Sequence, residues 1–228
     1  MLTKKKKLSK KEIKEDKLVT FYYKAYGYFD DNKSKVFAYI GGFLVLLALI
    51  AFYINYRHQQ NIHAGIELSR VIPLYDSGSF LEAIEGRAGT NIIGLKKIVD
   101  EYGSTENGET AKIYLANSYN MLGKYDDAYK YYKDYSGSFN MYKATALAGQ
   151  ASYFANKNNY EKAADLYRKA SRVSKNDVLN SGYLLQAGVN YMSAHKQQDA
   201  KEMFKAIIKD YLTTPEYRDA NKYLAEIQ

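Results

Sequence analysis

The chain contains no cysteine and no tryptophan, and only two of its 228 residues are proline. The lack of cysteine excludes disulfides, thiolate metal sites, a thiol nucleophile and lipid attachment through cysteine. Proline breaks helices, and clusters of turn-forming residues separate them. Because the chain has few prolines and long stretches without such clusters, the sequence predicts a helical protein.

Sequence patterns of catalysis and metal binding are also missing. There is no HExxH, no GxSxG and no Walker A motif. The three histidines are His58, His63 and His195, and the gap of five residues between the first two does not place them on one helical face. The acidic pair Asp126-Asp127 falls in a predicted turn between helices, where it complements the dipole of the next helix. We therefore expect no enzyme activity, no catalytic residue, no metal, no cofactor and no small-molecule substrate.

One long apolar run, residues 36–54, organises the chain. Its 19 positions hold no charged residue, while Lys33, Lys35 and Arg57 bracket it. At ~1.5 Å per residue a helix of this length covers about 28 Å, close to the thickness of the hydrocarbon core of a bilayer. Tyrosines and phenylalanines near both ends suit the headgroup level. A buried helix of a soluble domain would be shorter or would carry a polar stripe, so the run predicts one transmembrane helix.

The distribution of charge predicts the orientation of this helix. Residues 1–35 hold eleven lysines against five acidic residues, whereas only Arg57 lies within ten residues after the run. Positive flanks stay in the cytoplasm, so the C-terminal domain is expected outside. With no small-x-small cleavage site after the run, we expect an uncleaved signal anchor. The first 35 residues carry +6 of the net charge of +8, so residues 36–228 carry only +2 and no nucleic-acid surface is expected.

The segment before the apolar run has two parts. Residues 1–17 are rich in lysine, and we expect a disordered tail that interacts with anionic lipid. Residues 18–29, Leu-Val-Thr-Phe-Tyr-Tyr-Lys-Ala-Tyr-Gly-Tyr-Phe, are strongly aromatic. Two interpretations of this second part stay open, a short helix at the membrane interface or a loosely ordered aromatic linker.

Helical spacing continues after the apolar run, as far as Tyr75. The membrane helix is expected to extend into this stretch, and Pro73 with Asp76-Ser-Gly78 is expected to end it. No alternation typical of strands follows anywhere downstream. The sequence therefore predicts an all-α protein.

A phrase recurs three times in the C-terminal region. It reads Gly123-Lys-Tyr-Asp-Asp-Ala128, then Asn158-Asn-Tyr-Glu-Lys-Ala163, then His195-Lys-Gln-Gln-Asp-Ala200, and its alanines are 35 and 37 residues apart. A fainter copy, Gly78-Ser-Phe-Leu-Glu-Ala83, precedes them, and its second helix is interrupted at 86–91 and resumes over 92–102. Each phrase lies between two apolar helices. Such spacing indicates a stack of helix pairs.

This pattern resembles tetratricopeptide repeats, which place a small residue where two helices cross and an aromatic residue four positions later. The helix-terminating proline of that family is missing from all three units. The expected organisation is an N-terminal transmembrane helix followed by a TPR-like helical-repeat solenoid. Its parts are a cytoplasmic segment 1–35, the anchor 36–54, a helical segment with a degenerate unit 55–108, three repeats 109–212 and a capping helix 213–228.

The repeat resemblance implies a concave protein-binding groove, lined by the first helix of each pair. It carries no lysine or arginine clamp for a carboxylate, so apolar or extended protein segments are the expected ligands. Packing between repeats is the alternative role for these side chains. By repeat position the groove residues are Ile113, Asn117, Asn120, Met121, Ser152, Asn156, Leu185, Val189 and Met192.

The whole arrangement resembles the YfgM-like family of bacterial inner-membrane proteins. The residues that carry the resemblance are Val19-Thr-Phe-Tyr22, the single span, the helix over 62–75 and the repeats. The resemblance implies a cytoplasmic N-terminus, a periplasmic domain and an ancillary role at the Sec translocon. The partners it implies are translocon subunits, a periplasmic chaperone of the peptidyl-prolyl isomerase type and exported polypeptides. The alternative is a structural scaffold subunit of another envelope complex.

Overall fold

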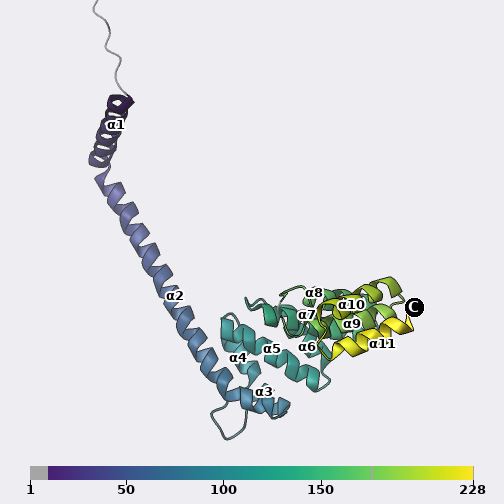
Figure 1. The fold of residues 1–228 in the computed structure, drawn as a ribbon. Helices are drawn as coiled ribbons and strands as arrows, with labels where there is room; N and C mark the ends of the chain where they lie inside the picture. Colours follow the sequence, from purple (N-terminus) through teal and green to yellow (C-terminus); the bar gives the residue numbers. More distant parts are fainter. Residues whose placement is uncertain (1–9, 176, 228) are drawn as a thin grey trace, which may run out of the picture. The chain divides into compact units, whose positions relative to one another are not determined.

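The structure is a computed structural model that describes residues 10–175 and 177–227. Its described residues form helices and no strand, with one isolated antiparallel bridge between Gly86 and Ile93, so the all-α prediction is confirmed (Figure 1). The chain divides into two compact units, of which the first ends at Tyr56 and the second begins at Arg57. The helices are α1 Lys10–Asp31, α2 Lys33–Asp76, α3 Phe80–Glu85, α4 Leu95–Tyr102, α5 Glu106–Met121, α6 Tyr125–Asp134, α7 Asn140–Asn156, α8 Tyr160–Ala170, α9 Asn180–Ser193, α10 Gln197–Asp210 and α11 Glu216–Glu226.

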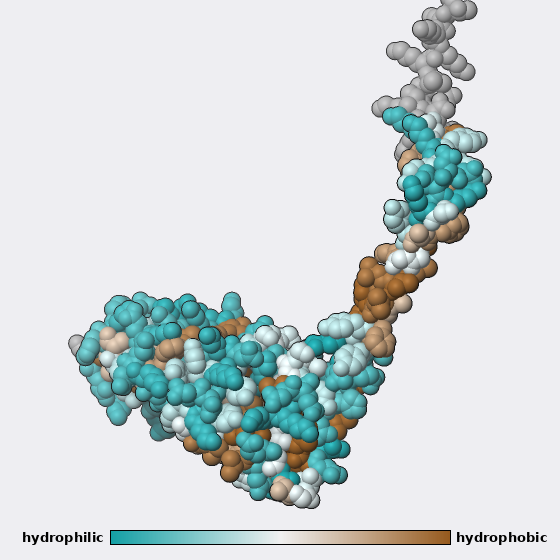
Figure 2. Space-filling view, turned by 180° about the vertical axis from the view of Figure 1, so that it is seen from behind, coloured by the Kyte–Doolittle hydropathy of each residue, from teal (hydrophilic) through white to brown (hydrophobic). Residues whose placement is uncertain are grey.

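The first unit contains α1 and the first part of α2. The apolar run 36–54 lies within α2, which is long and apolar enough to cross a membrane, and the side chains in its most apolar window are not buried. Figure 2 shows this run as a hydrophobic band. The expectation that the helix continues past the run is confirmed, because α2 extends to Asp76.

One local prediction is wrong, and one is confirmed. Residues 10–17 were expected to be disordered but belong to α1; lysine and glutamate are good helix formers. Residues 1–9 of the predicted tail lie outside the described part. Pro73 with Asp76-Ser-Gly78 was expected to end α2, and the helix does end at Asp76, with Pro73 inside its last turn. Pro73 lacks the N–H that would bond to the carbonyl of Ser69, so it weakens the helix just before its end.

The second unit is held together by three clusters of buried apolar side chains. In the first, Leu68, Val71 and Leu74 of α2 pack with residues of α3 to α7. The second cluster joins α8 to α11, and the third, smaller one joins α7, α8 and α9. Helices that follow each other along the chain make most of the contacts between helices.

The recurring phrases share one turn geometry. The first residue of each, Gly78, Gly123, Asn158 and His195, has a positive φ of 77°, 73°, 58° and 59° respectively. In all four turns the next residue donates its backbone N–H to a carbonyl five residues earlier, as in Lys196 to Tyr191 (2.8 Å). This left-handed residue ends one helix and lets the next begin. The sequence repeat is therefore also a repeat of backbone conformation.

Small residues allow the helices that flank these turns to approach closely. Ala128, Ala163 and Ala200 are 2, 0 and 0% exposed, as the repeat pattern predicted. A Cβ atom added to Gly188 would lie 2.4 Å from the ring of Phe204. The side chain at each of these positions therefore limits the distance between helices.

Candidate protein-binding surface

The structure places the predicted groove residues of α5 in unlike surroundings. Ile113 is only 2% exposed and belongs to the first apolar cluster. Asn117 is half-buried, and its Oδ1 accepts a hydrogen bond from Tyr132 Oη at 2.6 Å. Asn120 is half-buried, whereas Met121 is 63% exposed. Of these four, Met121 offers the largest apolar surface to a partner.

The predicted residues of α7 and α9 are mostly half-buried. Ser152 is half-buried and Asn156 is exposed. Leu185, Val189 and Met192 pack against the second apolar cluster but keep part of their surface in solvent. These residues therefore combine packing between helices with an exposed edge.

A group of six tyrosines accompanies the predicted residues, and sequence reasoning did not single it out. Tyr75 contacts Tyr114 edge to face at 4.9 Å. The pKa of Tyr132 is raised, first by burial and then by the neighbouring hydroxyls of Tyr75, Tyr167 and Tyr183. The only signal in the sequence was the abundance of tyrosine, 25 residues. Tyr142 forms a hydrogen bond with Tyr114. We call the group the tyrosine row, and its members are Tyr75, Tyr114, Tyr132, Tyr142, Tyr167 and Tyr183.

Polar side chains on the first helices pair with the hydroxyls of the tyrosine row. Burial raises the pKa of Tyr167, and a hydrogen bond with Ser152 acts in the opposite direction. Burial likewise raises the pKa of Tyr183, against the effect of a hydrogen bond with Thr145. Neutral phenols, amides and hydroxyls can donate and accept hydrogen bonds, so they suit the backbone of an extended polypeptide.

One hollow lies beside the tyrosine row, with a volume of about 290 Å³. Leu185 lies in its wall, and Ser181 donates a hydrogen bond to Glu216 of its rim at 3.0 Å. Pockets for small molecules usually measure ~300–1,000 Å³ and are more enclosed, so this hollow suits a side chain of a partner better. The residues that line it are Tyr167, Val178, Leu179, Gly182, Tyr183, Leu185, Gln186 and Glu216.

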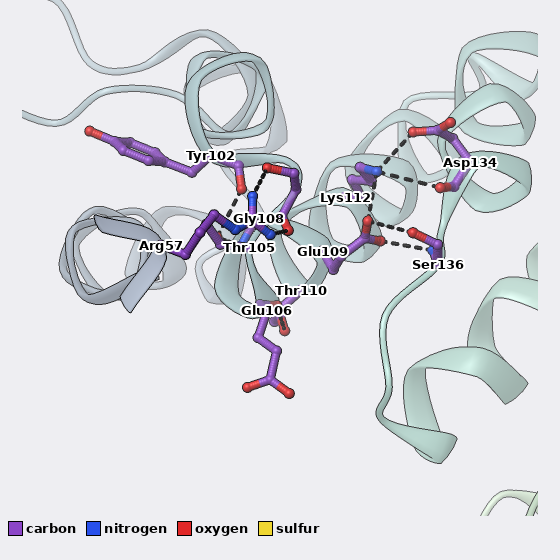
Figure 3. Close-up of polar contacts among 11 residues, drawn as sticks. Arg57, Tyr102, Thr105, Glu106, Gly108, Glu109, Thr110, Lys112, Asp134 and Ser136 are labelled. Atoms are coloured by element: carbon purple, nitrogen blue, oxygen red, sulfur yellow. Dashed lines mark hydrogen bonds and ion pairs between the residues drawn. The ribbon is translucent and has the colours of Figure 1, made fainter. Parts of the chain in front are cut away.

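A polar network with Glu109 and Lys112 buried at its centre, and Asp134 and Ser136 exposed at its edge, holds the start of α5 (Figure 3). Lys112 Nζ lies 2.9 Å from Glu109 Oε1 and 2.8 Å from Asp134 Oδ2. Glu109 also accepts hydrogen bonds from the backbone N–H and the hydroxyl of Ser136, at 2.9 and 2.8 Å. Burial lowers the pKa of Lys112, but its hydrogen bonds with Asp134 and Glu109 outweigh this and raise the pKa overall. All the polar atoms named are paired, so the network joins α5 to the end of α6.

Further polar contacts fix the segment that precedes α5. Arg57 donates to the hydroxyl and carbonyl oxygens of Ser104, and the hydroxyl of Thr105 caps α5 by accepting from Gly108 N at 3.0 Å (Figure 3). Asn61 Oδ1 accepts from Asn107 N at 2.8 Å. These bonds orient the α5 N-terminus within the second unit.

Among the described residues, no group of histidine, aspartate or glutamate side chains has the geometry of a metal site. In the comparisons with known proteins, no family model and no curated protein matches this chain.

Proposed function

We propose that this chain is a membrane-anchored, non-enzymatic adaptor or co-chaperone that binds proteins where they leave the cytoplasm. In this proposal α2 is a signal anchor with a cytoplasmic N-terminus, and the second unit is a TPR-like repeat domain in the periplasm. The partners are subunits of the Sec translocon, a periplasmic chaperone of the peptidyl-prolyl isomerase type and exported polypeptides, as in the YfgM-like family. The anchor keeps the domain near the export site, so a weak affinity for polypeptides is sufficient.

The observation that carries the proposal is the combination of repeated turns with the tyrosine row. Four turns of the same backbone geometry stack helix pairs. Stacked pairs create an extended surface that suits a polypeptide. Tyr132 and Tyr183 are buried, and the other four members of the tyrosine row are half-buried; with the hollow at Leu185 these four supply both apolar contact and hydrogen-bonding groups along that surface.

A pull-down from membranes in mild detergent tests the proposal. The full-length chain is expected to co-purify with translocon subunits. Recovery of subunits of a different envelope complex, without the translocon, would instead favour the scaffold alternative. Recovery of neither would contradict both.

A matched pair of variants tests whether the predicted groove makes the contact. Met121→Asp places a charge on the groove side, whereas Leu212→Asp does so at a site of the same exposure outside it, 64% against 63%. Burying either apolar side chain against a partner is worth ~1.5–3 kcal/mol, so Met121→Asp should reduce recovery about tenfold or more while Leu212→Asp should not. Melting curves must be unchanged in both. Equal recovery from the two variants would remove the groove from the proposal.

A further inference from the structure

The C-terminal half of α1 has two opposite faces. At ~100° per residue, positions i, i+4, i+7 and i+11 of a helix fall on one stripe. One stripe, which we call the aromatic stripe, consists of Leu18, Tyr22, Ala25 and Phe29. The opposite stripe consists of Thr20, Lys24, Gly27 and Asp31. Such a division is typical of a helix that lies along a boundary between apolar and polar surroundings.

The aromatic stripe is largely uncovered. Leu18 is 63% and Tyr22 62% exposed. The ring of Tyr22 stacks on that of Tyr26, at 6.2 Å between centroids, and meets that of Tyr23 edge on. A continuous exposed apolar face of this kind marks an interaction surface.

The aromatic stripe ends where the apolar run of α2 begins. Phe29 packs edge to face on Phe37, with 5.9 Å between the ring centroids, and Lys33 pairs with Asp30. Only Asn32 separates α1 from α2. A bilayer that contains the run therefore has its headgroup layer at the end of α1.

The charge of this part of the chain favours a lipid surface over a protein partner. Eleven of the first 35 residues are lysines. A lysine close to an anionic bilayer contributes ~1 kcal/mol of attraction, and tyrosine rings prefer the headgroup level. A protein partner would explain the aromatic stripe but not the lysines on both sides of it.

We propose that α1 is a second membrane-binding element, which lies on the bilayer with its aromatic stripe among anionic headgroups. This inference rests on the membrane anchoring proposed above. Its effect is to hold the N-terminal segment on the membrane surface, so that the chain has two contacts with the bilayer rather than one.

Because the chain lacks tryptophan, a single introduced tryptophan reports its own surroundings. The full-length variant Tyr22→Trp is reconstituted in nanodiscs of phosphatidylcholine with phosphatidylglycerol. Tyr39→Trp in the apolar run and Tyr125→Trp in the second unit provide the membrane and water references. The emission of Tyr22→Trp should be blue-shifted relative to Tyr125→Trp and quenched by brominated lipid. Both effects should weaken when phosphatidylglycerol is omitted.

The matched control is Gly27→Trp on the opposite stripe, where an added Cβ meets no atom within 4 Å. Its emission should stay accessible to aqueous acrylamide. Equal quenching of Tyr22→Trp and Gly27→Trp would overturn the orientation, and a shift independent of phosphatidylglycerol would overturn the role of charge. If the emission of Tyr22→Trp matches that of Tyr125→Trp while that of Tyr39→Trp shows a tryptophan inside the bilayer, the inference is wrong and the aromatic stripe of α1 binds a protein instead. If the emission of Tyr39→Trp also shows a tryptophan exposed to water, the proposed membrane anchoring itself is wrong.

Discussion

The two units use the same apolar residue types in opposite ways. In the first unit Leu44 and Phe52 are 59% and 71% exposed, whereas in the second unit Leu95 and Phe204 are fully buried. Among the described side chains, every buried residue lies at Ala64 or later. The second unit therefore covers its own apolar surface with protein, and the first unit depends on its surroundings to cover it. Substitutions of one type should consequently have unequal effects in the two units.

Removing an ion pair should show the largest difference in lost stability between the two units. In the second unit Lys112 and Glu109 are each 9% exposed, while the Lys33–Asp30 pair of the first unit is about half exposed. Lys112→Ala leaves a buried carboxylate without its charged partner and should lower the free energy of unfolding by ~3–5 kcal/mol. Lys33→Ala should change it by less than ~1 kcal/mol. Urea denaturation followed by circular dichroism measures both. Similar losses of stability in the two variants would mean that burial does not determine how much these ion pairs contribute to stability.

Glycine-to-alanine substitutions test packing in the same way. An added Cβ at Gly108 would lie 1.8 Å from the carbonyl oxygen of Tyr102, whereas at Gly41 it meets nothing within 4 Å. Because backbone atoms cannot move aside, Gly108→Ala should destabilise the second unit by ~3 kcal/mol. Gly41→Ala should leave the melting temperature unchanged. A stable Gly108→Ala protein would show that α4 and α5 can separate at this crossing.

Alkaline pH should destabilise the second unit. Burial, followed by the nearby Tyr131 hydroxyl and acidic side chains, raises the pKa of Tyr119 from its ordinary value of 10.0 to about 12. A raised folded pKa contributes stability that is complete below pH ~10 and is lost as pH rises through ~12, since the unfolded chain releases the proton first. Allowing for partial exposure, Tyr119 accounts for on the order of 1 kcal/mol. Denaturation of the wild-type chain and of Tyr119→Phe at pH 8 and pH 11.5 measures it. The variant should lose less stability, and an equal loss would exclude Tyr119 as a source.

The smallest expected effect is a gain in stability, at the turn that begins with His195. His195 has a φ of 59°, which costs a residue with a side chain ~1–2 kcal/mol and costs glycine nothing. Part of this gain is offset by the greater freedom of glycine in the unfolded chain, so His195→Gly should stabilise by ~0.5–1 kcal/mol. Asn158→Gly should gain less, because the short polar side chain of asparagine can hydrogen-bond locally in this conformation. Thermal melts of the two variants and the wild type test this order. A loss of stability in His195→Gly would show that the imidazole has a partner worth more than the strain.

The features that sequence predicted well are local ones. The apolar run and the recurring phrases depend on consecutive residues, so the long helix and the turns at Gly123, Asn158 and His195 could be anticipated. The end of α2 could be anticipated for the same reason, because Asp76-Ser-Gly78 is a local turn signal and the helix ends at Asp76.

The candidate surface was harder to predict, because exposure is decided by neighbouring helices. Repeat position alone put Ile113 beside Met121, yet the first is in the core and the second on the surface. Tyr75 and Tyr114 are far apart in the sequence and meet only after α2 and α5 pack. Lys112 lies three residues from Glu109, but Ser136, which donates two hydrogen bonds to it, comes from beyond α6, so the local sequence indicates only part of its environment.

Contacts between consecutive helices also determine how this domain reaches its structure. Because most of the helix pairs in contact are adjacent in the chain, its loops close over short distances and its contact order is low, which is the condition for rapid folding. The first apolar cluster involves no residue beyond α7. The α3–α7 part can therefore pack as the chain is made, before α9 to α11 exist. Little apolar surface of this part is then exposed to water while the rest of the chain is still being made.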